Sequence, residues 1–533
     1  MGLVIRKAAA GDAPGWLDLV KGTLGDDFPD KSLYDTSWIA EQLDPANPVE
    51  TWVADVNGRL HASASFLPPA TENKNPIANI GRHLNRPESF GDGSAEALLR
   101  KLGEISLARK QVAVARVLAS DNRAQILYEN AGYSCAGFQP FKHLHRVREG
   151  VLFYVRMSGT DLVSRLPMSD SLPQITEIAA CVLRSLKISN PAPVRDGVTG
   201  YPLQGELTFQ DGTSDDFELW RMQAQAANPP VEISGSFNQG AGYMRSGTPV
   251  DNRSVLAQRD GKFIAGIAYN FDAQDRCFRL IDSFSQDDLS MGPLLNHTVK
   301  LAQQQHGAVY VEVDILVTAP RLLKASEQLG FVPVAYLPAF YAKGTQMADV
   351  VKMVKLNMGY SLENTNFTAH AKSVADIIDH SFQDQKMGVA IINLLRALPF
   401  FEGLGDGELR KIARLFTQKL YRPGEKVFGK GDLGKEAYVI MRGLIDILLE
   451  ENAKPIASIG NGQIFGELAF LDGAARTAIA QATQASILLV IQRSAFNDLV
   501  QHEPHLGMVV MRNIGIELSN RLRKANAALA AKK

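Results

Sequence analysis

An order of strands and helices that occurs twice constrains the fold of this chain more than any other feature of its sequence. Residues 1–158 read as alternating strands and helices, and the same order returns over residues 252–336. The pair Gly132-Tyr133, which follows a predicted helix in the first copy, corresponds to Gly330-Phe331 in the second. Such alternation is typical of an α/β layer, and its recurrence predicts a divergent internal repeat.

The chain changes character near residue 399. Beyond it, glycines arrive every few residues between short β-branched strands, which predicts a small β-barrel or jelly roll. Apolar residues at helical spacing predict a helical connector before the barrel and a long helix after it. The expected fold class is therefore multidomain α/β plus β, in which two α/β domains are followed by a barrel with flanking helices. The expected bounds are 1–158 and 160–358 for the α/β domains, 366–397 for the connector and 398–533 for the barrel domain.

The charge balance argues against one class of function. The 533 residues include 56 Lys+Arg and 57 Asp+Glu, so the formal net charge is -1. Binding to nucleic acid through bulk positive charge is therefore not expected, because phosphate contacts need a basic surface.

The sequence gives no sign of a metal site, a disulfide framework or a membrane span. Cys135, Cys181 and Cys277 lie far apart with no Cys-x-x-Cys pair, so neither a zinc site nor a disulfide framework is predicted. His143 and His145 alternate on a predicted strand without a third ligand, so we expect no metal. Reduced cysteines favour a cytoplasmic location. Since no run of about 18 apolar residues occurs, no membrane span is expected.

Two glycines precede a predicted helix in the first domain, within the segment Phe90-Gly91-Asp92-Gly93-Ser94-Ala95-Glu96. Small residues let a backbone approach a phosphate closely, and the first N–H groups of a helix have no internal partners. The segment suits a pyrophosphate, but taken by itself it also fits an ordinary turn into a helix.

The helix predicted over residues 122–131 holds a second candidate. Asp121 or Asn122 caps this helix, and Gly132 ends it. Tyr128 shares a face with small and apolar residues, which is compatible with a core tyrosine. It is also compatible with a proton donor, because an ordinary tyrosine pKa of about 10 suits protonation of a thiolate leaving group.

Together the two segments resemble the GNAT family of acyl-CoA-dependent N-acetyltransferases. The family's loop, Arg/Gln-x-x-Gly-x-Gly/Ala, is similar to residues 90–95, and its helix motif, Asn-x-x-Ala-x-x-Leu-Tyr-x-x-x-Gly-Phe/Tyr, is similar to residues 121–133. The resemblance covers nearly all of residues 1–158. It implies that Tyr128 protonates the departing CoA thiolate. It also implies an acetyl-CoA site at Phe90, Gly91, Asp92, Gly93, Ser94, Ala95, Glu96 and Asp121.

Three residues depart from the family pattern. Phe90 replaces the loop's Arg or Gln, Asp92 stands where Lys or Arg is common, and Asp121 replaces the usual Asn. A carboxylate near a pyrophosphate is unfavourable, so we expect weakened acyl-CoA binding, with the backbone donors of the loop retained. No motif fixes the general base, for which three residues that read as solvated loop positions are candidates: Glu72, His83 and Glu88.

The second copy lacks both features. Its loop, residues 285–295, has no paired glycines, and Pro293 removes a backbone donor. Ser326 stands where Tyr128 stands in the first copy, so no proton donor is available. We expect a degenerate GNAT-like domain used for packing or substrate binding, and the alternative is a second active site with unusual residues.

The sharpest motif of the chain covers residues 465–478. A short helix is expected to begin at Gly466-Glu467, where free N–H groups can meet an anion. Arg476 offers a planar fork for a phosphate, and Glu467 can accept a hydrogen bond from a ribose hydroxyl. The alternative is a surface ion pair between these two side chains, which stabilises a protein little.

This stretch resembles the phosphate-binding cassette of the cyclic-nucleotide-binding family, and residues 422–432 and 438–443 match the turns of that family's barrel. The resemblance covers about residues 398–525 and implies a pocket for cyclic AMP or cyclic GMP, with the terminal helix as a lid over the base. Family prevalence favours cyclic AMP, since Thr477 can contact either the phosphate or a guanine edge. The implied contacts are Phe465, Gly466, Glu467, Leu468, Ala469, Arg476, Thr477 and Ala478.

The combined resemblances imply a cyclic-nucleotide-regulated N-acetyltransferase that transfers acetyl from acetyl-CoA to a protein lysine or a small-molecule amine. The connector over residues 366–397 would carry the regulation. The alternative is a non-catalytic cyclic-nucleotide sensor whose GNAT-like domains bind partners, a reading favoured by Phe90, Asp92 and Asp121.

Overall fold

In a computed structural model the chain divides into two units, Met1–Ser381 and Phe382–Lys533. Among the helices that the structure describes, none combines the length and the hydropathy needed to cross a bilayer. The residues that the structure describes are 2–26, 28, 30–68, 77–144, 147–157, 165–166, 172–188, 198–226, 252–343, 345–451 and 453–530.

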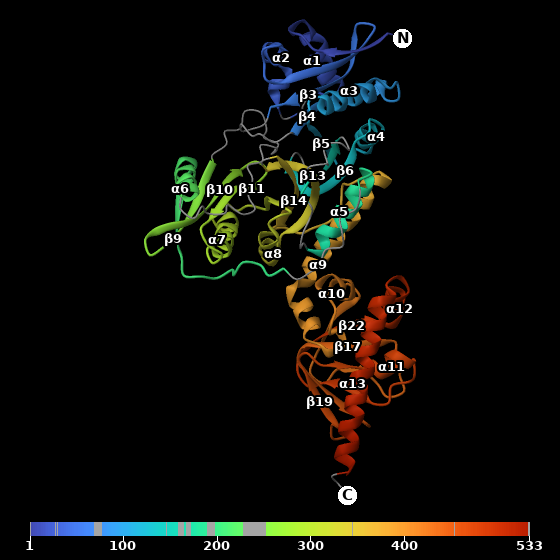
Figure 1. The fold of residues 1–533 in the computed structure, drawn as a ribbon. Helices are drawn as coiled ribbons and strands as arrows, with labels where there is room; N and C mark the ends of the chain where they lie inside the picture. Colours follow the sequence, from blue (N-terminus) through green and yellow to red (C-terminus); the bar gives the residue numbers. More distant parts are fainter. Residues whose placement is uncertain are drawn as a thin grey trace. The chain divides into compact units, whose positions relative to one another are not determined.

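A single sheet, with 14 strands in the described residues, forms the core of the first unit (Figure 1). Its strand order is β1-β2-β3-β4-β5-β7-β6-β13-β14-β12-β11-β10-β9-β8. The first half contains β1 (Leu3–Lys7), β2 (Glu50–Val56), β3 (Arg59–Leu67), β4 (Ile77–Asn85), β5 (Val112–Leu118), β6 (Ser134–Leu144) and β7 (Arg148–Arg156). The second half contains β8 (Thr208–Thr213), β9 (Asn252–Arg259), β10 (Lys262–Asp272), β11 (Cys277–Ser285), β12 (Tyr310–Leu316), β13 (Val332–Lys343) and β14 (Gln346–Leu356).

The two halves have the same internal order, read outward from their joint. Each contains one parallel pair, β4 with β5 and β11 with β12, among otherwise antiparallel neighbours. The joint is an antiparallel pairing of β6 with β13 through Gly137 and Ala335. These two residues hold equivalent positions in the two copies, as a local two-fold relation between the halves requires. A Cβ added to Gly137 would lie 2.2 Å from the Ala335 Cβ, so glycine permits the close approach.

A backbone irregularity also recurs at equivalent positions. Phe141 in β6 has a φ of 54°, and Ala339 in β13 has a φ of 50°. Both lie where the strand register shifts, between Gln139 and His143 in β6 and between Leu337 and Tyr341 in β13. Positive φ is uncommon in residues other than glycine. Its recurrence at matched bulges therefore supports common descent of the two halves.

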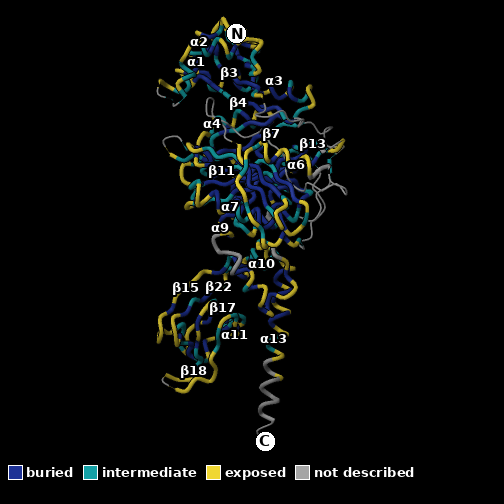
Figure 2. The backbone as a smooth tube through the Cα atoms, turned by 90° about the vertical axis from the view of Figure 1, so that its left-hand side faces the viewer, coloured by how far each residue is buried: buried dark blue, intermediate teal, exposed yellow. Residues whose placement is uncertain are grey.

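Helices cover the faces of this sheet. Helix α3 packs on β2 and β3, and α5 packs on β6 and β13 at the joint. Figure 2 shows the strands of the central sheet as largely buried, with exposed residues gathered on loops and outer helix faces. The helices of this unit are α1 (Ala13–Leu24), α2 (Thr36–Gln42), α3 (Ser94–Ala108), α4 (Asn122–Asn130), α5 (Pro173–Ser185), α6 (Ser214–Ala226), α7 (Met291–Gln304) and α8 (Pro320–Gln328).

Two parts of the first unit differ from the sequence expectation. Residues 191–230 read as turn-rich with a hairpin, whereas their described part contains β8 followed by helix α6. Strand β14 was not anticipated, because Pro338 and Gly344 interrupt the apolar run before it. It pairs with both β12 and β13, so its place in the sheet is set by tertiary contacts rather than by local pattern.

The second unit contains the predicted jelly roll with flanking helices. One four-stranded sheet has the order β15 (Phe416–Tyr421), β22 (Ser486–Gln492), β17 (Glu436–Arg442) and β20 (Ile464–Phe465). The other has the order β16 (Lys426–Phe428), β21 (Ile479–Ala482), β18 (Leu444–Leu448) and β19 (Ala457–Gly460). Its helices are η5 (Pro399–Phe401), α10 (Asp406–Ala413), α11 (Glu467–Asp472), α12 (Arg493–His502) and α13 (Pro504–Ala530), while α9 (Ala369–Arg396) crosses the boundary between the units.

Candidate functional site

A cavity of about 700 Å³ lies inside the second unit. Its wall includes all eight residues that the sequence assigned to a nucleotide: Phe465, Gly466, Glu467, Leu468, Ala469, Arg476, Thr477 and Ala478. The eight come from β20, from helix α11 and from the segment that leads into β21. The structure therefore gathers the predicted residues around one cavity.

Arg476 is the buried cation of this cavity, with 5% of its surface exposed. Its Nη1 donates to the Gly466 carbonyl at 2.7 Å, and its Nη2 donates to the Glu436 carbonyl at 2.6 Å. The guanidinium carbon lies 4.2 Å from the centroid of the Phe428 ring. The buried Nε atom has no hydrogen-bond partner among the described residues. Burial lowers the pKa of this guanidinium, so a bound anion would relieve a desolvated charge.

Glycines permit the close packing around Arg476. Gly466 has a φ of 76°, and an added Cβ would lie 2.8 Å from the Arg476 Nη1. A Cβ added to Gly434 would lie 2.0 Å from the Ala469 Cβ on α11. Glu467, the first residue of α11, is buried and lines the same cavity as Arg476. Carboxylate and guanidinium therefore border one space, as a sugar-phosphate requires.

Several residues of the cavity wall were not predicted from the sequence. Phe428, Ile447 and Ile459 supply apolar surface from three strands of the barrel, and Pro399 and Phe400 supply more from η5. Glu517 on helix α13 also lines the cavity, which agrees with the expected position of the terminal helix beside the base. Alternation of apolar residues along the strands could have indicated Phe428, whereas the contributions of η5 and α13 depend on tertiary packing.

The glycine loop of the first unit is open. Gly91 and Gly93 have φ values of 92° and 78°, and a Cβ added to either meets no described atom within 4 Å. Helix α3 begins directly afterwards at Ser94. Gly93 and Glu96 border a shallow groove of about 390 Å³ along one face of α3. The backbone here can accept a ligand's close approach, as the sequence indicated.

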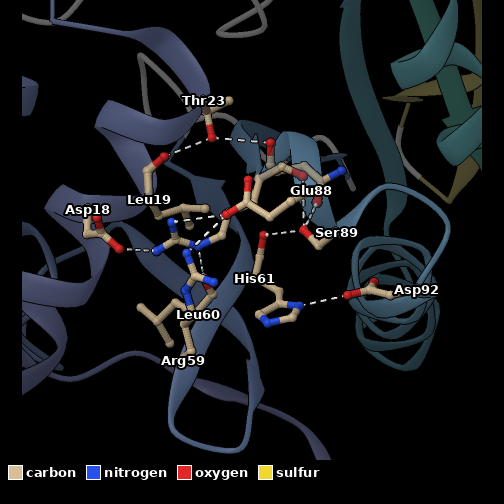
Figure 3. A network of polar contacts seen from close by, with 11 residues as sticks. Asp18, Leu19, Thr23, Arg59, Leu60, His61, Glu88, Ser89 and Asp92 are labelled. Carbon is tan, nitrogen blue, oxygen red and sulfur yellow. Dashed lines mark hydrogen bonds and ion pairs between the residues drawn. The ribbon is translucent and has the colours of Figure 1, made fainter.

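The Asp92 carboxylate accepts a hydrogen bond from one of the backbone N–H groups of this loop. Its Oδ1 accepts the Ser94 N–H at 2.8 Å and the Ser94 hydroxyl at 2.6 Å, and its Oδ2 lies 2.7 Å from the His61 Nδ1. Figure 3 shows Asp92 at the start of α3 with its carboxylate directed at the His61 ring. Burial opposes ionisation, but the bonds from Ser94 and His61 lower the pKa of this carboxyl. The expectation that every loop donor stays available is therefore wrong for Ser94.

Tyr128 lies in an aromatic cluster with 2% of its surface exposed. Its ring meets His83 and Tyr133 edge-on at 5.5 and 5.3 Å and stacks on Tyr154 at 5.8 Å. Burial raises its pKa well above the ordinary value, so in this state Tyr128 is a weaker acid than the ordinary tyrosine on which the sequence prediction relied. Asp121 accepts the Ala124 N–H at 3.0 Å and so caps the helix that carries Tyr128.

Strand β4, whose His83 contacts the Tyr128 ring, carries three polar atoms without hydrogen-bond partners among the described residues. Asn79 Oδ1, His83 Nε2 and Asn85 Nδ2 are buried and form no hydrogen bond within the part of the chain that the structure describes. Burial lowers the pKa of His83 to about 4, although Asp121 opposes the shift. The parallel pairing of β4 with β5 stops at Ile80 and Ala115, so these strands separate before β4 ends. His83 and Asn85 thus lie beyond the end of the pairing, whereas Asn79 lies within it, opposite Val114.

Among the three candidate bases, His83 is therefore a strand residue and not the solvated loop residue that the sequence suggested. Glu88 lies in the 3-10 helix Pro87–Ser89 and pairs with Arg59 at 3.0 Å (Figure 3). Glu72 lies outside the described residues.

In the second copy a segment of the chain itself, residues 200–205, lies against α7 and α8, and we call it the strap. A Cβ added to Gly200 would lie 3.1 Å from the Ala325 N on α8, and one added to Gly292 on α7 would lie 2.0 Å from the Pro202 carbonyl oxygen. Asn296 Nδ2 on α7 donates to the Leu203 carbonyl at 3.1 Å. The strap thus contacts α7 and α8, the counterparts of α3 and α4.

Two arginines at equivalent positions, Arg123 and Arg321, differ in their contacts. Arg321 at the start of α8 lies 4.4 Å from the ring centroid of the buried strap residue Tyr201 and pairs with Asp288. Arg123 at the start of α4 lies 5.4 Å from the Phe90 ring centroid, is exposed, and makes no ion pair within the described residues. Ser326, at the Tyr128 position, has a buried hydroxyl without a partner among those residues.

The remaining metal candidate is a pair of side chains. His143 Nδ1 lies 2.8 Å from the Asp275 carboxylate in a buried contact, and His145 lies outside the described residues. Across the described ranges, no three His, Cys, Asp or Glu side chains are grouped in a way that could hold a metal ion.

Comparison with known proteins agrees with the geometry of the second unit. Residues 418–503 match the model of the family described as "Cyclic nucleotide-binding domain". The matched residues contain β20, α11 and Arg476, which line the cavity. The chain therefore contains a cyclic nucleotide-binding domain, with a pocket for a cyclic nucleotide.

The curated relatives share this domain. The chain is 30% identical over 138 residues to the cyclic AMP receptor protein of Thermus thermophilus, a match over 25% of this chain and 62% of the relative. It is 27% identical over 169 residues to the cAMP-dependent protein kinase regulatory subunit of Schizosaccharomyces pombe, over 30% of this chain and 38% of that protein. The solved structure of the Thermus thermophilus catabolite activator protein matches with 30% identity and a TM-score of 0.23, over 25% of this chain and 62% of that one. The chain spans less than two thirds of each of these proteins.

Proposed function

We propose that this protein is an acyl-CoA-dependent N-acyltransferase whose activity is set by cyclic AMP. The observation that carries the proposal is the occurrence, in one molecule, of a cyclic nucleotide-binding domain and of an open glycine loop that follows β4 and precedes α3. The acceptor is a primary amine, either a protein lysine or a small molecule.

The chemistry follows from the groups around β4. A neutral amine attacks the thioester carbonyl, a C–N bond forms, and the C–S bond of the resulting tetrahedral intermediate breaks. Tyr128 gives its proton to the leaving thiolate, and the amine loses one proton to solvent or to a base. The unpartnered polar atoms of Asn79, His83 and Asn85 supply hydrogen-bonding groups at the edge where the reacting amine would enter.

The nucleotide proposal rests on Arg476 and Glu467. The buried Nε of Arg476 has no partner among the described residues and suits a phosphate oxygen, while Glu467 suits a ribose hydroxyl. The name of the Thermus thermophilus relative, a cyclic AMP receptor protein, supports cyclic AMP as the ligand. Calorimetry with cyclic AMP and cyclic GMP on wild type and Arg476→Ala tests this. We expect binding to weaken about 100-fold or more, because a buried charged hydrogen bond is lost.

A second candidate function is a non-catalytic cyclic-nucleotide sensor. It is favoured by the Asp92 carboxylate, which accepts the Ser94 N–H that a pyrophosphate would otherwise use. Release of CoA from acetyl-CoA with a mixed set of amines separates the two functions. Turnover that is lost in Tyr128→Phe supports the transferase, whereas an absence of turnover with every amine, together with intact nucleotide binding, supports the sensor.

A further inference from the structure

The first turn of α9 and the residues before it are fastened to helix α4 of the first unit. Gln125 on α4 is fully buried, and its side chain forms a reciprocal pair with this segment. Its Nε2 donates to the Asn366 carbonyl at 3.0 Å, and its Oε1 accepts the Thr368 N–H at 3.0 Å. We call residues 366–370 the clasp.

The Thr368 hydroxyl forms two hydrogen bonds, one with α9 and one with α4. Its Oγ1 accepts the Ala371 N–H at 3.1 Å, which caps the start of α9. The same hydroxyl donates to the Glu129 Oε1 at 2.5 Å. Glu129 also accepts the Tyr154 hydroxyl at 2.8 Å, so one carboxylate joins α9, α4 and β7. A change at the start of α9 therefore acts directly on α4.

Gln125 and Glu129 flank Tyr128 on the same helix. Residues three and four apart are neighbours on a helix surface, so Gln125 is a neighbour of both Tyr128 and Glu129. Tyr128 also stacks on Tyr154, the second donor to Glu129. Two further bonds hold the ends of this region, from the Asn366 N–H to the Ala119 carbonyl at 2.8 Å and from the Cys135 N–H to His370 Nε2 at 3.1 Å.

At α8, the corresponding helix of the second copy, the residues that take the places of Gln125 and Glu129 differ in their chemistry or in an ion pair that they form. Leu323 on α8 takes the place of Gln125, and it has no group that could form the reciprocal pair. Glu327 takes the place of Glu129, but it pairs with Lys324 of its own helix at 2.9 Å. Among the described residues, the reciprocal pair of the clasp is thus confined to the copy that carries the tyrosine.

Helix α9 continues without a break to Arg396 in the second unit, two residues before Leu398 in the wall of the nucleotide cavity. Within that unit, Leu395 is fully buried and Asp384 forms a bidentate pair with Arg414 at 2.5 and 2.6 Å. The end of α9 is therefore fixed to the domain that binds the nucleotide, as its start is fixed to α4.

We propose that the clasp transmits the state of the nucleotide pocket to helix α4, with Thr368, Gln125 and Glu129 as positioning residues for Tyr128. This inference rests on the proposed function, because it names the route by which the same reaction is regulated. An effector can change a distant site only if it favours one of two arrangements, and α9 with α4 is the element whose arrangement changes.

Hydrogen–deuterium exchange on the full-length protein tests the clasp without any turnover. Cyclic AMP, or cyclic GMP if cyclic AMP does not bind, is added at saturation, and protection of residues 465–478 reports its binding. In wild type we expect exchange across residues 119–131 to change by about fivefold or more, the scale of ordinary coupling between sites. Thr368→Val removes the hydroxyl, and we expect it to abolish this change while protection of 465–478 remains.

Three further variants distinguish a positioning role of the clasp residues from a general effect on the stability of the fold. Thr368→Ser keeps the hydroxyl and should restore the response, and Gln125→Leu, the residue of the second copy, should abolish it by a different route. Ser373→Ala removes a hydroxyl that donates to the His370 carbonyl at 2.7 Å and lies 3.7 Å from the Cys181 Sγ on α5. Among the described residues it makes no bond to α4, so it is the matched control for stability.

The inference is overturned if residues 119–131 do not respond to a bound nucleotide in wild type, or if the response survives in both Thr368→Val and Gln125→Leu. It also falls if neither nucleotide protects 465–478. Failure of the transferase proposal is seen separately, as absent CoA release in a protein whose exchange response is intact.

Discussion

The two halves of the large sheet share strand order and matched bulges, yet they differ at the place where each would hold a cofactor. In the first half, Gly91 and Gly93 face open space and Arg123 has no described ion pair. In the second half, the strap contacts α7 and α8, and Arg321 is engaged by Tyr201 and Asp288. The two halves therefore share one architecture while the surface of the helix that follows the parallel strand is left open in the first and is contacted by the strap in the second.

The largest expected difference between the halves concerns the proton donor. Tyr128→Phe should lower the rate of CoA release by about 100-fold or more, the usual contribution of a general acid. Ser326→Ala, at the equivalent position, should leave the rate unchanged. Steady-state release of free thiol measures both. Loss of turnover in the second variant alone would reverse the assignment of the two halves.

The next difference concerns stability in acid. His83 has a pKa of about 4, below the ordinary value of about 6.5, because burial disfavours its charged form. As pH falls below 6.5 the unfolded chain binds this proton first, so folding loses stability down to pH 4, by about 2 kcal/mol at pH 5.

The second half has a serine, Ser283, at the strand position that corresponds to His83. The substitution His83→Ser should therefore remove the loss of stability in acid. Urea unfolding at pH 7 and pH 5 measures the effect, with His61→Asn as the control at a more exposed histidine. An unaltered loss of stability in His83→Ser would show that other groups cause it.

A smaller effect is expected at the matched arginines. Arg123→Ala should weaken CoA binding about tenfold, because it removes the cation that contacts Phe90 in the proposed acyl-CoA loop. Arg321→Ala should leave CoA binding unchanged and instead increase hydrogen exchange of residues 198–206, because the contact with Tyr201 is removed. Calorimetry and exchange on both variants give the comparison. Weaker CoA binding in Arg321→Ala would place a donor site in the second half.

The smallest effect is expected at Asp92. Asp92→Asn removes a negative charge from the loop and weakens the hold on the Ser94 N–H, so CoA should bind about threefold more tightly. Asp287→Asn is the control, since Asp287 bonds to Ser290 and Leu289 in the loop of the second half. Equal or weaker CoA binding in Asp92→Asn would mean that the carboxylate does not compete with a phosphate.

Contiguous motifs were predictable from the sequence, and long-range contacts were not. Residues 465–478 form one stretch, and all eight predicted contacts within it line a single cavity. The antiparallel hairpin of β2 and β3 is also set by a local pattern, because Asn57-Gly58 is a sequence typical of a two-residue hairpin turn. The strap reads only as a cluster of turn formers, since its partners on α7 lie about 90 residues away in the chain. The clasp joins residues more than 200 apart, so no local pattern could indicate it.

The most direct test of this account is the stoichiometry of CoA binding to the full-length protein, measured by calorimetry with and without saturating cyclic AMP. The account predicts one site per chain, weakened in Arg123→Ala and unaffected by Arg321→Ala. It also predicts that cyclic AMP and CoA change each other's affinity by the same factor, as linkage requires. Two equivalent sites, or no CoA binding in a protein that binds the nucleotide, would contradict it.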